Sequence, residues 1–333
     1  MVIEPNDDGS EEIIHADVVQ NVACPALTNC ELQSIGDSWP ESLTLNLLEG
    51  MLNHSVVNMS FGFQRPSSSM SAHSAINNPG SNELSYQEQL SNYYDRLEGL
   101  EQLFRQNPNV MFSVAAGNGY SIGGLVTDGV PLVRRYAIYP AFMLYENVLK
   151  VTSIDSTEVE ESELNTYKID TYANYSVDLV DLAAPVETLD DGIKGTSFAA
   201  PFVSRLAEKA FNKNLSLNQV KEMLYKSSYV QGLKSAIKLT QEYLSDGENS
   251  TIYKIENERK KQTREQMIAE IHPVLLVKSG GPLVETVFEQ CLDNYETLGL
   301  TVEDACLQAH VEILNASQSR VEDLKSFWAL RNL

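Results

Sequence analysis

The sequence lacks any apolar run long enough to span a bilayer, which needs about 20 consecutive apolar residues. Its first eight residues also lack the basic segment and the apolar segment of a secretory signal peptide. We therefore expect no membrane span. We expect a protein that is cytoplasmic or is exported without a classical signal peptide.

Basic residues are scarce, since 24 Lys and Arg stand against 46 Asp and Glu and give a formal net charge of -22. The densest basic run is the Arg-Lys-Lys at residues 259–261, and no basic stripe surrounds it. Binding of nucleic acid needs clustered cations that neutralise phosphates. The composition therefore excludes nucleic acid as a partner.

Cysteine is also rare, with Cys24, Cys30, Cys291 and Cys306 in two distant pairs. Neither pair has the spacing of zinc ligands or a neighbouring histidine cluster, so we expect no metal centre. We predict reduced thiols. A bridge between Cys24 and Cys30 is the alternative in an oxidising compartment.

The 333 residues are 43% hydrophobic, which is enough for a sizeable core. Apolar runs rich in Val, Ile and Met alternate with helical patterns through the first two thirds, which is typical of a parallel sheet covered by helices. Residues 86–106 place Leu, Tyr and Phe on one helical face. The expected strands are residues 2–3, 56–60, 110–115 and 149–153.

After about residue 231 the strand signals disappear, and Glu, Lys, Gln and Leu dominate. We therefore predict an α/β domain over residues 1–231 and a mostly helical C-terminal extension over residues 232–333. Ser216 is the expected N-cap of the helix at residues 217–225. The expected helices of this half are residues 197–211, 217–225, 234–244, 255–271, 284–295 and 302–317.

Residues 195–201 (Gly-Thr-Ser-Phe-Ala-Ala-Pro) place a serine at the start of a helix. Its hydroxyl would lie near backbone N–H groups and the positive end of the helix dipole. Small residues at Ala199 and Ala200 would let the helix pack closely on a sheet, and Pro201 is tolerated in a first turn. Ser197 is therefore a candidate nucleophile, with an ordinary N-cap serine as the alternative.

This string resembles the serine motif of the subtilases, a family of serine peptidases, and other segments of the chain resemble further motifs of that family in the same order. The resemblance implies a three-layer subtilisin-like fold with a mainly parallel central sheet and a serine endopeptidase activity on proteins or peptides. The matching segments are residues 58–62, 115–118, 139–141, 146–151, 172–176 and 180–185.

The resemblance also assigns roles to residues. Asn118, in Ala-Ala-Gly-Asn, would donate to the oxyanion of the tetrahedral intermediate, as in the family. Ser60, Phe61 and Gly62 would line the groove and pair with the substrate as an added strand. The bulk of Phe61 beside the expected primary pocket does not indicate a residue preference.

His15 stands where the family has His-Gly-Thr-X-Val-Ala on a helix, and is the candidate base. The family's Gly and Thr are replaced here by Ala16 and Asp17. Glu4 stands where the family has the aspartate that orients the histidine, with Asp7 and Asp8 as alternatives on the following loop.

Because the histidine motif is altered and the family's aspartate is replaced, the rival interpretation is a pseudopeptidase that binds peptides or proteins without cutting them. A third is a specialised processor whose C-terminal helices recruit one protein partner. We predict no cofactor. Calcium is common in the family, and the loops that would bind it are not recognisable here, so calcium binding stays open.

Overall fold

In the computed structural model the described residues are 2–5, 13–24, 32–35, 54–66, 85–119, 121–122, 125–126, 128–132, 136–154, 168–186, 195–246 and 276–333. Asp7, Asp8 and Cys30 lie outside these ranges, as does the helix expected at residues 255–271. Most of the loop expected between the second strand and the helix at residues 86–106 lies outside them too.

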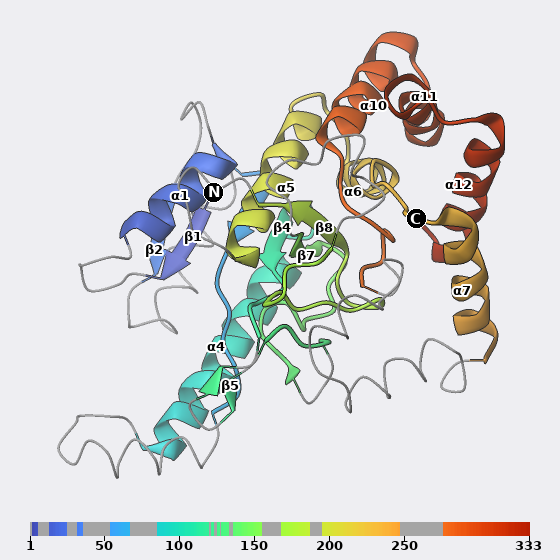
Figure 1. The fold of residues 1–333 in the computed structure, drawn as a ribbon. Helices are drawn as coiled ribbons and strands as arrows, with labels where there is room; N and C mark the ends of the chain where they lie inside the picture. The colour runs from blue at the N-terminus through green and yellow to red at the C-terminus, as the bar shows by residue number, and fades with distance from the viewer. Residues whose placement is uncertain are drawn as a thin grey trace.

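A six-stranded sheet forms the centre of the fold, and every neighbouring pair of its strands is parallel. The strand order is β2-β1-β3-β4-β7-β8 (Figure 1). The four predicted strands are confirmed as β1, β3, β4 and β7. The strands are β1 (Val2–Pro5), β2 (Leu32–Ile35), β3 (Val56–Met59), β4 (Met111–Ala115), β7 (Val148–Ile154) and β8 (Leu182–Pro185).

A two-stranded antiparallel ribbon, β5 (Ser121–Ile122) with β6 (Leu125–Val126), lies outside this sheet. The helices before the C-terminal part are α1 (Ile13–Ala23), α4 (Tyr86–Gln106), α5 (Thr196–Phe211) and α6 (Leu217–Lys226). Ser216 is the N-cap of α6, as predicted, and forms a capping box with Gln219. Ser85 does the same for α4 with Glu88.

Both faces of the sheet are covered by helices. Successive side chains of a strand point to opposite faces, so one strand contributes to two cores. In β4, Met111 and Ala115 belong to a core shared with α1 and α5. Phe112 and Val114 belong to a second core shared with α4. This three-layer arrangement confirms the predicted α/β fold class, and it places α5 directly on the sheet.

The C-terminal part of the chain contains α7 (Leu233–Asp246), α10 (Glu285–Leu298), α11 (Val302–Leu314) and α12 (Gln318–Arg331). Apolar residues of α10, α11 and α12 share one core with α5 and α6. Ion pairs also join α5 to α10, among them Arg205 to Glu285 and Lys209 to Glu285. The domain boundary expected after residue 231 stays a prediction.

A segment that precedes α10 runs beside β8. The N–H of Leu283 donates to the carbonyl of Ala183, and Lys278 donates to Asp181 over 2.8 Å. Asp181 is fully buried, and Lys150 also faces it. Burial raises the pKa of Asp181, but Lys150 and Lys278 outweigh it and hold the pKa below its usual range. The segment is therefore tied to the sheet by both backbone and charge.

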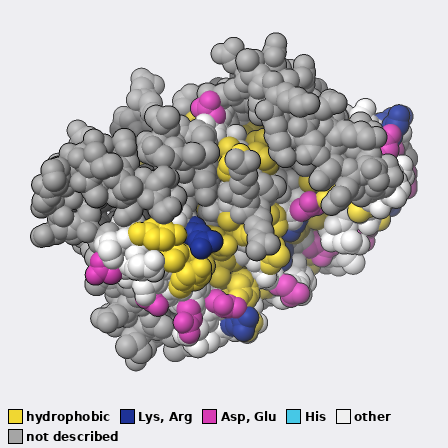
Figure 2. Space-filling view, turned by 90° about the horizontal axis from the view of Figure 1, so that it is seen from below, with side chains coloured by type: hydrophobic (Ala, Val, Ile, Leu, Met, Phe, Trp, Pro, Cys, Tyr) yellow, Lys and Arg dark blue, Asp and Glu magenta, His cyan; other side chains and the backbone are white. Residues whose placement is uncertain are grey.

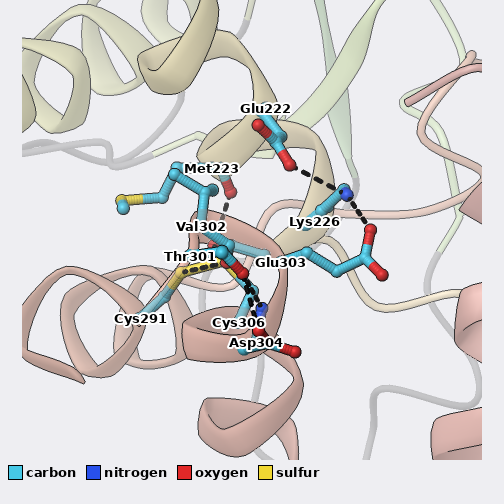
Figure 3. A network of polar contacts seen from close by, with 10 residues as sticks. Glu222, Met223, Lys226, Cys291, Thr301, Val302, Glu303, Asp304 and Cys306 are labelled. Atoms are coloured by element: carbon cyan, nitrogen blue, oxygen red, sulfur yellow. Dashed lines mark hydrogen bonds and ion pairs between the residues drawn. A yellow bond between two sulfur atoms is a disulfide. The ribbon is translucent and has the colours of Figure 1, made fainter. Parts of the chain in front are cut away.

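The prediction of reduced cysteines is wrong. Cys291 of α10 and Cys306 of α11 form a disulfide, which Figure 3 shows as a yellow bond. Cys24 is disulfide-bonded as well. Both Cys291 and Cys306 are fully buried between two helices that pack side by side, which brings the two thiols together. Residues 299–301 alone connect the two helices, and such a short connection makes them antiparallel neighbours.

Next to this disulfide lies Lys226, the last residue of α6, which is buried although it carries a charge. Its ammonium group pairs with Glu222 over 2.9 Å and with Glu303 over 2.6 Å (Figure 3). It also lies 5.1 Å from the ring centroid of Trp328. The backbone carbonyl of Lys226 faces His310 Nε2 at 2.8 Å. These contacts join α6, α11 and α12.

Candidate active site

The predicted nucleophile lies where the carboxyl end of β3 meets the start of α5. Ser197 is the second residue of α5, and the residue after β3 is Ser60. Ser197 Oγ donates to the carbonyl of Ser60 over 3.0 Å, and Ser60 Oγ donates to the carbonyl of Ser197 over 2.6 Å. The two residues that the sequence separates by 137 positions are therefore in direct contact.

The start of α5 suits a nucleophile because its own N-cap residue makes no side-chain hydrogen bond to the helix. The N-cap residue is Gly195, which has no side chain to bond the first N–H groups of the helix. These N–H groups and the helix dipole favour negative charge at this point. Ser197 is half-buried, so its hydroxyl is held by protein contacts and still borders the surface.

The predicted oxyanion residue Asn118 lies beside the same helix start. Its Oδ1 accepts from the backbone N–H of Thr196 over 2.9 Å and from the hydroxyl of Thr196 over 3.0 Å. The hydroxyl of Thr196 also accepts from the N–H of Gly117 over 3.0 Å. Two donors thus fix the orientation of the amide. The Nδ2 of Asn118 lies close to Gly195, because a Cβ added to Gly195 would be only 3.1 Å from Nδ2.

A residue to which the sequence gave no role supports the loop that carries Asn118. Asn174 is fully buried, and its Nδ2 donates to the carbonyls of Ala116 and Gly119 over 3.1 Å each. Its Oδ1 accepts from the N–H of Val130 over 2.9 Å. Its own N–H donates to the carbonyl of Gly117. Asn174 therefore holds the backbone on both sides of Asn118. Its segment, residues 172–176, resembles a family motif, but that resemblance gave Asn174 no role.

The expected groove segment, residues 60–62, follows β3 directly. Ser60 is buried, Phe61 is half-buried and Gly62 is exposed. The residue after this segment, Phe63, exchanges two backbone hydrogen bonds with Tyr139, each of 2.9 Å. The groove segment is thus fixed at one end by Ser197 and at the other by Tyr139.

For His15 and Glu4 the structure describes the position in a helix and in a strand, respectively. His15 is in the first turn of α1, which packs against α5 and contributes Val19 to the core shared with that helix. Glu4 is in β1, where Ile3 pairs with Met59 of β3, so the next register position sets Glu4 beside Ser60. Their side chains lie outside the described part of the structure. Their contact with Ser197 stays a prediction.

Within the described ranges, no group of three His, Cys, Asp or Glu side chains is arranged to hold a metal ion. In the same ranges, none of the helices is both long and apolar enough to cross a membrane.

Several solved structures resemble this fold. A lanthipeptide protease aligns with a TM-score of 0.42 and 16% identity over 68% of this chain and 70% of its own. A cold adapted subtilisin-like serine proteinase aligns with a TM-score of 0.36 and 18% identity over 61% and 62%. MycP1 from Mycobacterium smegmatis aligns with a TM-score of 0.35 and 17% identity over 58% and 50%. Among curated proteins, none matches the sequence.

The family comparison covers more than half of the chain. The model of the subtilase family matches residues 33–263, a range that contains Ser60, Asn118 and Ser197 and begins after His15. These three residues are the ones that the structure brings together at the start of α5. The chain belongs to the subtilase family of serine-type peptidases.

Proposed function

We propose that the protein is a serine endopeptidase that hydrolyses peptide bonds in proteins or peptides, with Ser197 as its nucleophile. The observation that carries this proposal is the joint position of Ser197 and Asn118 at the start of α5. A hydroxyl and an amide donor at the start of one helix match what attack on a carbonyl requires.

In this proposal Ser197 Oγ attacks the carbonyl carbon of the scissile bond, and His15 takes the hydroxyl proton. The tetrahedral oxygen accepts hydrogen bonds from Asn118 Nδ2 and from the backbone N–H of Ser197. His15 then protonates the leaving amine, and a water molecule hydrolyses the acyl-enzyme through the same base. Glu4 orients His15, with Asp7 and Asp8 as the alternatives from the sequence.

The substrate pairs with residues 60–62 as an added strand, which gives affinity through main-chain hydrogen bonds. The C-terminal helices offer a surface for a protein partner. Of the two compartments expected from the sequence, the disulfide between Cys291 and Cys306 supports the exported one, because disulfides persist in oxidising compartments.

An alkyl fluorophosphonate probe tests the activity of Ser197 without knowledge of the substrate. The wild-type protein is expected to be labelled, and Ser197→Ala is expected to abolish the label. Ser204→Ala is the matched control, since Ser204 lies on the same helix and its hydroxyl bonds the carbonyl of Ala200. This variant should keep the label. A folded wild-type protein that takes no label would support the pseudopeptidase instead.

A further inference from the structure

Ile138 occupies the space between the two backbone segments that flank the nucleophile. A Cβ added to Gly62 would lie 2.8 Å from Ile138 Cγ2. A Cβ added to Gly117 would lie 2.9 Å from Ile138 Cδ1. The isoleucine side chain is therefore in close contact with both glycines, one on each segment.

Backbone hydrogen bonds of Ile138 and of the residue after it fix the position of this isoleucine. Its carbonyl accepts from the N–H of Phe142 over 2.8 Å, and the next residue, Tyr139, is bonded to Phe63 by two backbone hydrogen bonds. Ile138 is only 4% exposed and belongs to the core that also contains Val114. The side chain of Ile138 is therefore packed in the core, and a ligand cannot rotate it away as it could rotate an exposed side chain.

The segments that contact Ile138 are those that would hold a substrate. Gly62 lies two residues after Ser60, whose carbonyl accepts from Ser197 Oγ. Gly117 precedes Asn118, whose amide is oriented by Thr196. In the proposed function, a peptide that presents its carbonyl to Ser197 and Asn118 lies between these segments. The side chain on the acyl side of the scissile bond then enters the space whose inner end is Ile138.

We propose that Ile138 closes this pocket, so that the enzyme cleaves after residues with small side chains, Gly, Ala or Ser. This inference rests on the proposed function. Because interiors are close-packed, a large substrate side chain would meet the isoleucine and could not be accommodated by a small shift.

The experiment compares Ile138→Ala and the milder Ile138→Val with the wild type. Each protein is reacted with two peptidyl diphenyl phosphonates that differ only in carrying Ala or Phe at the residue next to the phosphorus. The wild type is expected to react faster with the Ala compound. Because one methylene in an apolar pocket changes selectivity about 10- to 200-fold, Ile138→Ala should shift the Phe-to-Ala ratio of second-order rates by at least about 10-fold toward Phe.

Ile169→Ala is the matched control, because Ile169 is 5% exposed and belongs to the same core. It makes the same change in side-chain volume without facing the two glycines and should leave the ratio unchanged. If Ile138→Ala does not fold, Ile138→Val, which removes one methyl group, should shift the ratio in the same direction. Cleavage sites in a defined peptide mixture, mapped by mass spectrometry, give the same preference independently.

The small fluorophosphonate of the preceding section separates the two proposals, since it carries no residue side chain. A wild type that takes this label and reacts faster with the Phe compound would overturn the role of Ile138 and leave the peptidase intact. An equal shift of the ratio in Ile169→Ala would also overturn it. A folded protein that takes neither label contradicts the peptidase itself.

Discussion

The hydroxyl of Ser60 donates to the backbone carbonyl of Ser197 and replaces a hydrogen bond that α5 cannot make. In an α-helix this carbonyl accepts from the N–H four residues later. That residue is Pro201, which has no N–H. Asn58 Nδ2 in turn donates to Ser60 Oγ over 2.9 Å. The proline therefore leaves the carbonyl of the proposed nucleophile to be held by the strand that ends beside it.

We predict that Ser60→Ala lowers kcat about 10-fold, which corresponds to about 1.4 kcal/mol, a typical net value for one hydrogen bond. Pro201→Ala should restore part of this loss in the double variant, because the new N–H at position 201 can donate to the carbonyl of Ser197. The measurement is a double-mutant cycle on the rate of labelling by the fluorophosphonate and on kcat.

Ser113→Ala is the control for this cycle. Ser113 Oγ donates to the carbonyl of Ala200 over 2.9 Å, so it joins the same helix to the neighbouring strand β4. The residue four positions after Ala200 is Ser204, which has its own N–H. Pro201→Ala should therefore not rescue Ser113→Ala. Additive effects of Ser60→Ala and Pro201→Ala would contradict the compensating role of Ser60.

Asn174→Asp should lower kcat about 10-fold or more with little change in KM, because the variant loses the two donors that hold the loop around Asn118. Asn147→Asp is the matched control. Asn147 is also buried, and its Nδ2 also donates to two carbonyls, those of Phe104 and Asn107. Each variant should cost about 1–3 kcal/mol in stability through lost buried hydrogen bonds.

These two variants are compared at a temperature at which both are folded, as judged by circular dichroism. A fall in kcat for Asn174→Asp alone would identify Asn174 as a positioning residue. An equal fall in both would show that the effect is only one of stability.

The disulfide between Cys291 and Cys306 should stabilise the C-terminal helices. The two residues are 15 positions apart, and a bridge that closes a loop of about this length contributes about 3 kcal/mol. The variant with alanine at both positions should unfold at a correspondingly lower denaturant concentration. This variant isolates the bridge better than a reductant, because Cys24 is disulfide-bonded too. Thiols of Cys291 and Cys306 that react in the unfolded wild-type protein without reductant would contradict the bridge.

The elements that were predicted well are those specified by residues within the element itself or next to it. The helix expected at residues 86–106 has the bounds of α4, and Ser216 is the N-cap of α6. Both depend on periodicity and on a capping residue, which act within a few positions. The strand β8 was missed because Leu182, Ala183, Ala184 and Pro185 carry no strand signal of their own. Pairing with β7, in which Val151 lies opposite Leu182, makes this segment a strand.

The residues of the candidate site also fall into those that a local sequence motif indicates and those that only the folded structure brings into contact. Ser197 and Asn118 were predicted because each lies in a short motif that resembles the family, and the structure places both at the start of α5. Asn174 and Ile138 contribute only through contacts with segments distant in sequence. Nothing in a short stretch of sequence shows which loop a buried amide will hold or which pocket an isoleucine will fill.

His310 is fully buried in α11. Its Nε2 donates to the carbonyl of Lys226, and Nδ1 has no hydrogen-bond partner among the described residues. Burial lowers the pKa of His310 from 6.5 to about 4, because a second proton would place a charge in the core, near Arg320. The imidazole is therefore neutral in the folded protein near neutral pH.

In the unfolded chain the imidazole has its ordinary pKa and binds a proton more readily than in the folded protein. The stability that depends on neutral His310 is therefore complete above about pH 6.5 and is lost as the pH falls toward about 4, by up to about 3 kcal/mol. In His310→Leu, the free energy of unfolding should fall less steeply over this range, whatever its value at pH 7. His54→Leu, at a half-buried histidine, is the control. Denaturant titrations at several pH values measure the slopes, and a slope in His310→Leu equal to that of the wild type would contradict the role of His310.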